Sequence, residues 1–466
     1  MPLHDSSKEI FDHIRKESLD LYNRLHSVDY DARFVADVQQ YYPLFPLLPN
    51  LRCGAWYADP AIATDVPAYF KSTDGHTNNW SFNLRRANLH LLSLIAEQRG
   101  IVLVDSTRAG KRMPDALSKT VPIWCSVVNH AVLLRSRGHN SADTWDTALY
   151  TPPQVVSRQE HLQIEERLDK WAADLAASSY VLPALPLPLR PVWITPSSST
   201  FPAVKALQAD ALPVICVSAS RQVDNGLERR GAGFAYVQGS GDDHELWAKG
   251  LTPAIFWANH DRIIGASRED VEAVVESICA STYAQSLTAR APPSPVAKVA
   301  GRILLCAIDD LQLDSTDSRA AAVDDTVYVL ITQTPRPLHA SSAVEIYPMS
   351  SKNVQMEYLK TVLPQATAFI RSSLASGKNI CIACDTGSDL SVGVAVAALQ
   401  LNFDDDGHYT PSGKSDVPIA AKYIVDKKTI RRRLEWIIAS RAQANPSRTT
   451  LKRVNEFLLS SPTFRT

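Results

Sequence analysis

Short runs of aliphatic and β-branched residues alternate with helical patterns along most of the chain, and this alternation restricts the fold more than any other feature. Parallel strands need long crossover connections, so a repeated strand–helix order favours parallel sheets covered by helices. The sequence therefore predicts the α/β fold class. The candidate strands are residues 101–104, 192–195, 214–217, 234–237, 303–308, 326–332, 344–347 and 379–383, and the candidate helices are residues 81–98, 159–177, 353–375, 391–401 and one that begins near Pro122.

The segment ARAPPSPVAK, at residues 289–298, separates two such series. Its prolines remove backbone donors and disfavour helix, which is typical of a connection between domains. We therefore expect two α/β domains. The predicted limits are residues 1–290 for the N-terminal domain, 291–298 for a proline-rich linker and 299–466 for the C-terminal domain.

The total charge is nearly balanced, since 48 Lys and Arg oppose 49 Asp and Glu for a net charge of -1. Taken alone, that balance argues against a nucleic-acid partner. The distribution along the chain is uneven, however. Residues 85–137 hold nine basic residues against three acidic ones, and residues 427–453 hold nine against one. We interpret the total as concealing two basic regions that are able to face a polyanion.

The cysteines and the apolar stretches indicate the cellular compartment of the protein. Seven scattered cysteines, an odd number, indicate a reducing compartment rather than a framework of disulfides. The charged N-terminal residues lack the apolar core of a signal peptide, and prolines interrupt the most apolar stretch, residues 180–194. We expect a cytoplasmic protein with no membrane segment, and the sequence indicates no obligate protein partner.

The basic residues at 427–453 are too many for a helix to bury, so most of them must face water or a polyanion. A run of charge is often only a solvated helix face, but a single sign at this density favours contact with a nucleic-acid backbone. The predicted backbone-binding residues are Lys427, Lys428, Arg431, Arg432, Arg433, Arg441, Arg448, Lys452 and Arg453.

A strand, a short glycine-containing loop and a helix follow one another around Cys384, in the sequence CIACDTGSDLS. This layout resembles the phosphate-binding loop of cysteine phosphatases. Leu390 stands where those enzymes carry a phosphate-gripping arginine, and the upstream segment EIYPMSSKNVQ contains no Asp that would act as a general acid. Phosphatase chemistry is therefore disfavoured, whereas a backbone cradle for phosphate and a plain strand–helix turn both stay open. The predicted loop consists of Cys384, Asp385, Thr386, Gly387, Ser388, Asp389, Leu390 and Ser391.

The loop that follows the strand at residues 101–104 is rich in groups that bind anions. Asp105 comes first, and then two hydroxyls, a glycine and three cations precede the next helix. Cationic side chains near a helix N-terminus suit phosphate or pyrophosphate. The candidate phosphate-binding residues are Ser106, Thr107, Arg108, Lys111 and Arg112, and an earlier helix adds Arg85 and Arg86.

A second loop, after residues 234–237, carries acids instead. It contains Asp242, Asp243, His244 and Glu245. Acids at a strand end hold Mg²⁺, bind ribose hydroxyls or accept a proton, although they also cap helices, and a lone His76 or His244 is often structural. A basic and an acidic loop at strand ends of one sheet suit a phosphorylated sugar with a magnesium-bound leaving group.

Four long segments carry a family resemblance. They are TDGHTNNWSFNLRRANLHLL, VDSTRAGKRMPDALSKTVPIW, YVQGSGDDHELWAKGLTPAIFW and IRRRLEWIIASRAQANPSRTTLKRVNEFL. Over nearly the whole chain, the sequence resembles the fungal and plant initiator-tRNA 2′-O-ribosyl phosphate transferases. The resemblance implies a family-specific N-terminal domain and a C-terminal domain like the dual-specificity phosphatases.

The resemblance also implies an activity. Enzymes of that family transfer 5-phosphoribosyl from phosphoribosyl pyrophosphate to the 2′-OH of a T-stem adenosine, position 64, of initiator methionine tRNA. The modification keeps that tRNA out of elongation. Two rivals stay open: a catalytically silent module that binds RNA or a phosphoprotein, and a phosphatase with unconventional residues.

The resemblance does not fix the role of each residue, so the following assignment is our hypothesis. The phosphates would contact Ser106, Thr107, Arg108, Lys111, Arg112, Arg85 and Arg86. Asp242 and Asp243, or Glu245, would hold Mg²⁺ and the ribose hydroxyls, and Asp105 is a further acid in the site. His76 or His244 would accept the proton of the 2′-OH, and the C-terminal basic residues would bind the tRNA backbone.

Overall fold

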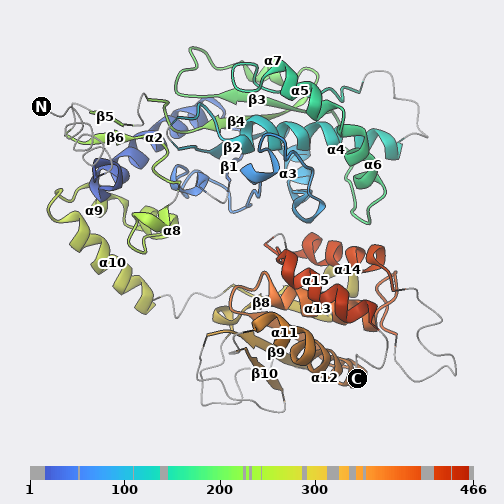
Figure 1. The fold of residues 1–466 in the computed structure, drawn as a ribbon. Helices are drawn as coiled ribbons and strands as arrows, with labels where there is room; N and C mark the ends of the chain where they lie inside the picture. Colours follow the sequence, from blue (N-terminus) through green and yellow to red (C-terminus); the bar gives the residue numbers. More distant parts are fainter. Residues whose placement is uncertain are drawn as a thin grey trace, which may run out of the picture. The chain divides into compact units, whose positions relative to one another are not determined.

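The computed structural model describes residues 16–50, 53–108, 110–136, 145–223, 227–229, 233–242, 244–285, 291–311, 325–334, 343–349, 353–410, 425–441 and 443–460. The chain divides into two compact units, each an α/β unit with its own sheet (Figure 1). The first comprises Met1–Ala177 and Val181–Ala284, and the second Ser178–Tyr180 and Gln285–Thr466. The predicted fold class is confirmed. The predicted limits at 290 and 299 stay a prediction.

A four-stranded parallel sheet, in the order β1–β2–β4–β3, forms the centre of the first unit. Its strands are β1 (Leu47–Pro49), β2 (Ile101–Asp105), β3 (Leu189–Ile194) and β4 (Leu212–Ser218). All residues of β2 and β4 are buried, as expected for parallel strands with both faces covered. Pro191 interrupts the pattern of β3, and that strand accordingly lies at an edge.

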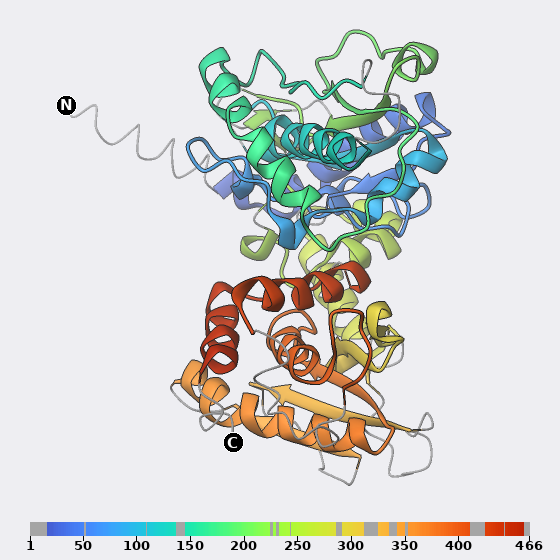
Figure 2. The ribbon, with the colours of Figure 1, turned by 90° about the vertical axis from the view of Figure 1, so that its right-hand side faces the viewer.

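Helices cover both faces of this sheet (Figures 1 and 2). On one face, Val102, Val104 and Ile215 share a core with α2 (Leu21–Tyr41), α8 (Pro253–Ala258), α9 (His260–Ile264) and α10 (Val271–Gln285). The intervening strand residues point to the other face, where α4 (Val121–Ser136) packs on β3 and α6 (Leu168–Ala176) packs on α4. A short helix, α7 (Val204–Leu207), lies between β3 and β4 in the sequence.

The start of α4 is irregular. A π-helical turn, Ala116–Thr120, runs directly into α4, so the helix begins before the predicted Pro122. Within the described residues, Ala116–Ser136 is the one helix long and apolar enough to cross a membrane. Because 78% of its most apolar window is buried inside the unit, it has the character of a core helix.

Two predicted helices of the first unit are interrupted. The pattern at 81–98 gives only a 3-10 turn, Leu84–Arg86, and α3 (His90–Gln98), because Asn88 lies between them at a φ of 49°. The Asn88 amide bonds the backbone of Tyr69 in both directions, which fixes a turn there. The pattern at 159–177 is divided between α5 (Arg158–Glu165) and α6.

The strand expected at 234–237 does not join the main sheet, so that part of the prediction was wrong. It forms β6 (Ala235–Val237), which pairs only with β5 (Leu227–Arg229) in an antiparallel ribbon. Two side chains of α2 explain the difference, since the backbone N–H of Ala235 donates to Asn23 Oδ1 and that of Val237 donates to Ser27 Oγ. These bonds use donors that a neighbouring strand would otherwise have taken.

The second unit has a five-stranded sheet in the order β10–β9–β11–β8–β7. Its parallel strands are β8 (Ile303–Ala307), β9 (Thr326–Thr332), β10 (Val344–Pro348) and β11 (Asn379–Cys384), all close to their predicted ranges. The predicted linker is partly ordered into this sheet. Ser294–Pro295 forms β7, antiparallel to β8, and Val296 is fully buried.

The helices of the second unit share one core with this sheet. They are α11 (Val354–Glu357), a π-helical turn Tyr358–Val362, α12 (Leu363–Ala375), α13 (Leu390–Asn402), α14 (Lys427–Ser440) and α15 (Arg448–Leu459). Buried residues of α12, α13, α14 and α15 belong to the same cluster as Ile303, Val329 and Ile382. Helix α13 is buried nearly all round, which is typical of a central helix.

Candidate active site

A cavity of about 570 Å³ opens at the carboxyl end of β2 in the first unit. Ligands of α/β sheets commonly bind at this end of the strands. The cavity is lined by Asn50, Cys53, Tyr69, Phe70, Lys71, Ser72, Thr73, His76, Asp105, Ser106, Thr107, Arg108, Lys111, Pro114, Asp115 and Asp242. Its volume is within the range of small-molecule sites.

Seven of the predicted site residues meet in this cavity. They are His76, Asp105, Ser106, Thr107, Arg108, Lys111 and Asp242. Cations and acids both line this cavity. Arg108 is exposed and Asp105 is buried, whereas Lys111 and Asp242 are both partly buried. The cavity thus offers an exposed cation and a buried carboxylate within one lining.

Asp105, the last residue of β2, has a carboxylate that accepts three hydrogen bonds. Asn50 Nδ2 donates at 2.8 Å, Cys53 Sγ at 2.7 Å and the Ser106 N–H at 2.9 Å. Burial outweighs these bonds and raises the pKa of Asp105 to about 6, and the nearby charge of Asp242 acts in the same direction. Burial also raises the pKa of the Cys53 thiol well above its ordinary value, so Cys53 is a hydrogen-bond donor here.

The basic and the acidic loop come together although β6 lies outside the main sheet. Gln238 Nε2 donates to the backbone oxygens of Arg108 and Lys111, at 3.2 and 2.7 Å. Gly239, at a φ of 69°, approaches so closely that a Cβ there would lie 2.3 Å from the Thr107 oxygen. Close packing of the loops, rather than a shared sheet, therefore brings Asp242 to the cavity.

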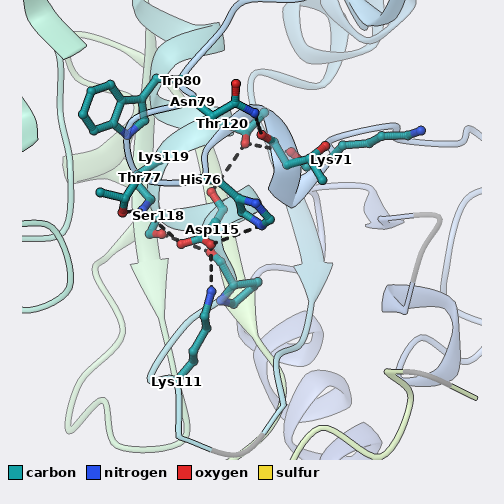
Figure 3. A network of polar contacts seen from close by, with 12 residues as sticks. Lys71, His76, Thr77, Asn79, Trp80, Lys111, Asp115, Ser118, Lys119 and Thr120 are labelled. Atoms are coloured by element: carbon teal, nitrogen blue, oxygen red, sulfur yellow. Dashed lines mark hydrogen bonds and ion pairs between the residues drawn. The ribbon is translucent and has the colours of Figure 1, made fainter. Parts of the chain in front are cut away.

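A cluster of charges lies beside the cavity, and three of its members, His76, Lys111 and Asp115, line it (Figure 3). The Asp115 carboxylate lies 2.8 Å from Lys111 Nζ, 3.1 Å from Lys119 Nζ and 3.7 Å from His76 Nε2. Lys119 also bonds Glu160 at 3.0 Å, and Glu160 accepts hydrogen bonds from Thr77 and Trp80. Bonds from both lysines lower the pKa of Asp115 against the opposing effect of burial, so its carboxyl is ionised at neutral pH.

Four predicted residues do not line the cavity. Arg86 forms two 2.9 Å bonds to Asp74, and both side chains are largely buried, which makes the pair structural. Arg85 lies on the same 3-10 turn. Arg112 bonds the side chains of Gln154 and Gln222, and His244 lies with its ring 5.6 Å from that of Trp56. Asp243 and the side chain of Glu245 lie outside the described residues.

Sequence reasoning missed Asn50, Cys53 and the stretch from Tyr69 to Thr73. The first two follow β1, a three-residue strand in a proline-rich run that shows no strand pattern. Asp115 and Lys119 stand in the segment quoted for the resemblance, but the π-helical turn sets their spacing, and it is Asp115 that approaches His76.

The Cys384 loop has the predicted strand–loop–helix form, and its polar groups are bonded within the second unit. Cys384 Sγ lies 3.1 Å from Ser391 Oγ, and bonds to the loop lower the pKa of the thiol despite burial. Asp385 bonds Thr332 and the N–H of Gln333. Gly387 O accepts from Arg441, and Asp389 accepts from the N–H of Ser447. Leu390 is buried in the core.

The basic segment at 427–453 divides into structural and exposed residues. Arg433 is buried, bonds Asp405 and the oxygen of Phe403, and lies over the ring of Trp436, so its assignment to RNA contact was wrong. Arg441 is likewise occupied by Gly387 and Ser294. Five exposed basic residues remain: Lys427, Lys428, Arg431, Arg448 and Lys452. Arg432 bonds Asp405 and Arg453 bonds Glu456, and both are partly exposed.

Comparisons with known proteins extend over both units. The family described as Rit1 N-terminal domain matches residues 14–280, and that described as Rit1 DUSP-like domain matches residues 344–458. The tRNA A64-2′-O-ribosylphosphate transferase of Saccharomyces cerevisiae is 32% identical over 97% of this chain and 95% of its own length. An uncharacterized protein of Schizosaccharomyces pombe is 44% identical over 56% of each chain.

Among solved structures, human DUSP28 covers 37% of this chain and 95% of its own, with 13% identity and a TM-score of 0.25. The assignment of the chain to a family rests on the sequence matches. The model of the N-terminal domain matches more than half of the chain, and the Saccharomyces cerevisiae relative aligns with nearly all of it. This chain belongs to the Rit1 family.

Proposed function

We propose that this protein transfers 5-phosphoribosyl from phosphoribosyl pyrophosphate to the 2′-OH of adenosine 64 in initiator methionine tRNA, and so excludes that tRNA from elongation. The observation that carries the proposal is the identity to the yeast A64 transferase along nearly the whole of both chains. The cavity supports it, because its charges match a donor that has phosphates at one end and ribose hydroxyls in the middle.

The donor phosphates would lie against Arg108 and Lys111 and the backbone N–H groups of the loop that begins at Ser106. The ribose hydroxyls would donate to the carboxylates of Asp105 and Asp242. Two carboxylates that face one cavity form an oxygen-rich donor set of the kind Mg²⁺ uses, and Asp242, with Asp243 beside it in the sequence, would hold the ion. When bound, Mg²⁺ would neutralise charge on the pyrophosphate.

In the transfer step, the acceptor 2′-oxygen forms a bond to C1 of the donor ribose while the bond from C1 to pyrophosphate breaks. The bonding pair leaves with pyrophosphate, and the 2′-OH proton goes to His76. Of the two histidines considered as bases, His76 lines the cavity. Positive charge develops at C1, so the protein contributes chiefly by orientation and by stabilising the leaving group.

The acceptor would approach this site from outside, because the volume of the cavity is enough for a small molecule but too small for an RNA duplex. A-form RNA exposes its 2′-hydroxyls along a wide, shallow minor groove, so the adenosine need not leave the stem. The five exposed basic residues of the second unit would contact phosphates of the tRNA. All seven cysteines are free, which agrees with the proposed location in the cytoplasm.

One experiment tests the proposal against its rivals. The full chain is incubated with phosphoribosyl pyrophosphate labelled in the ribose, Mg²⁺ and initiator methionine tRNA. We expect label on the tRNA, and none on the same tRNA carrying a 2′-O-methyl group at A64. Binding of tRNA without transfer of label would favour the silent module. Release of phosphate from an aryl phosphate would favour the phosphatase.

A further inference from the structure

Asp115 connects the phosphate-binding side of the cavity to the base, and its two carboxylate oxygens have different partners (Figure 3). Oδ1 lies 3.1 Å from Lys119 Nζ. Oδ2 lies 2.8 Å from Lys111 Nζ and 3.7 Å from His76 Nε2. One oxygen is therefore shared by a phosphate-binding cation and the residue that takes the proton.

The two lysines differ in how firmly they are held. The side chain of Lys119 is 6% exposed and has a second acidic partner, Glu160, at 3.0 Å. The side chain of Lys111 is 43% exposed. A buried lysine between two acids keeps its position, because moving it would leave the carboxylates of those acids unpaired and poorly solvated. A half-exposed lysine is able to exchange one anionic partner for another with little change in free energy.

The backbone places His76 beside this carboxylate. Gly75 packs directly on the turn that carries Asp115, and a Cβ on Gly75 would lie 2.7 Å from the Asp115 backbone oxygen and 2.8 Å from Thr120 Oγ1. Thr120 Oγ1 also bonds the oxygen of Lys71, which fixes the two segments together. The approach of His76 to Asp115 therefore depends on the absence of a side chain at position 75.

We infer that Asp115 is a positioning residue that couples donor binding to the base, through the exchange of Lys111 for His76 at Oδ2. When Lys111 turns to a donor phosphate, it leaves Oδ2 to the His76 imidazole. The carboxylate then orients that ring and stabilises the positive charge that it gains with the 2′-OH proton. Lys119 holds Oδ1 throughout, so Asp115 itself does not move. This inference rests on the proposed function, since it takes the cavity as the donor site.

The exchange is tested by NMR on the full chain with ¹³C-labelled histidine, with the His76 ring signals assigned from a His76→Gln variant. Inorganic pyrophosphate with Mg²⁺ is the probe, so neither tRNA nor turnover is needed. We expect pyrophosphate to move the His76 signals in the natural protein. In Lys111→Met, the His76 signals without pyrophosphate should already lie where pyrophosphate moves them in the natural protein. In Asp115→Asn, they should stay in place while pyrophosphate still binds.

A variant that changes no charge and a surface control complete the test. Gly75→Ala retains every charge but displaces His76, and it should lose the same response. Asp169→Asn is the matched control, because Asp169 pairs with His130 at 3.2 Å on the surface, outside the cavity. It should leave the response of His76 intact.

Kinetics provide a second readout. Asp115→Asn should lower kcat by about 10²-fold, in line with the contribution of a positioned base, while the KM for the donor changes by no more than about threefold. Equal movement of the His76 signals in Asp115→Asn and the natural protein would overturn the inference and leave the proposed function standing. Failure of pyrophosphate to bind at all would count against the proposed function itself.

Discussion

The loop after β2 and the loop after β11 have the same form but different chemistry. Both follow a buried central strand of a parallel sheet, and both lead into a buried helix. The first contributes Arg108 and Lys111 to a cavity. In the second, Asp385, Gly387 and Asp389 are all bonded to neighbouring segments of their own unit.

The difference shows that a strand–loop–helix shape does not make an anion site by itself. Backbone N–H groups at a helix start attract anions in either loop. What the first loop adds is positive charge that faces solvent. In the second, a buried Leu390 stands where the phosphatases carry arginine, and two carboxylates add negative charge. The first loop therefore has more of the features that bind a pyrophosphate, and in the second loop several polar groups already bond neighbouring segments.

The largest expected effect is on the β2 loop. Arg108→Ala should lower kcat/KM for transfer by about 10² to 10³-fold, because one charged contact that stabilises the leaving group is lost. Binding of tRNA, measured by filter retention, should stay within twofold. Arg112→Ala is the matched control, since Arg112 contacts two glutamines instead of the cavity. Similar losses in the two variants would contradict the assignment of the loop.

The next effect separates structural from exposed arginines in the second unit. Arg433→Met should lower the free energy of unfolding by about 1 to 2 kcal/mol, because the buried Phe403 oxygen and Asp405 lose a hydrogen-bond donor while Asp405 keeps Arg432. Urea denaturation followed by tryptophan fluorescence measures the change. Arg448→Met, at an exposed position, should change stability by less than about 0.5 kcal/mol. A stable Arg433→Met protein with weakened tRNA binding would restore Arg433 to the RNA surface.

A smaller effect, on tRNA binding, is expected when exposed basic residues of the second unit are reversed in charge. Lys427→Glu combined with Lys428→Glu should weaken tRNA binding about tenfold and reduce the salt slope by about two, as two phosphate contacts are lost. Transfer at saturating tRNA should be unchanged. Electrophoretic mobility shifts between low and moderate salt measure the slope. An unaltered slope would mean that this helix start faces only water.

The smallest effect is expected at the β11 loop. Cys384→Ser should leave transfer within about twofold, because the thiol bonds groups of its own loop, among them Thr386 and Ser391, and Leu390 stands where the phosphatases carry arginine. The label-transfer assay measures it. Complete loss of transfer in a folded Cys384→Ser protein would reverse the comparison between the two loops.

Most of the fold was predictable because strand and helix patterns are local. The runs at 101–104, 214–217 and 326–332 became central strands, since their β-branched residues are buried on both faces. The predictions failed where side chains from distant segments decided the structure. Asn88 interrupts the predicted helix by bonding Tyr69, and side chains of α2 bond the backbone of β6 outside the main sheet.

The candidate site was predictable in part for the same reason. Asp105, Ser106, Thr107, Arg108 and Lys111 follow a recognisable strand, so their place at its carboxyl end could be expected. The cluster around Asp115 could not, because it depends on the spacing of a π-helical turn and on Gly75. The buried Arg433 was also hidden from sequence, since its partner Asp405 lies in a separate acidic loop.

The π-helical turn at Ala116–Thr120 has a consequence for insertions and deletions. A π turn contains one residue more than the α-helix requires, and it confines that residue to a single turn. Deleting one residue there would let the helix continue regularly and keep the core face of α4 in register. Because the π turn confines the extra residue, the residues on both sides of the deletion would keep their faces. The change would be local: the wide turn that spaces Asp115 from Lys119 and from the segment of Gly75 would be lost. The extra residue of this turn therefore serves the contacts of Asp115 rather than the core of the scaffold.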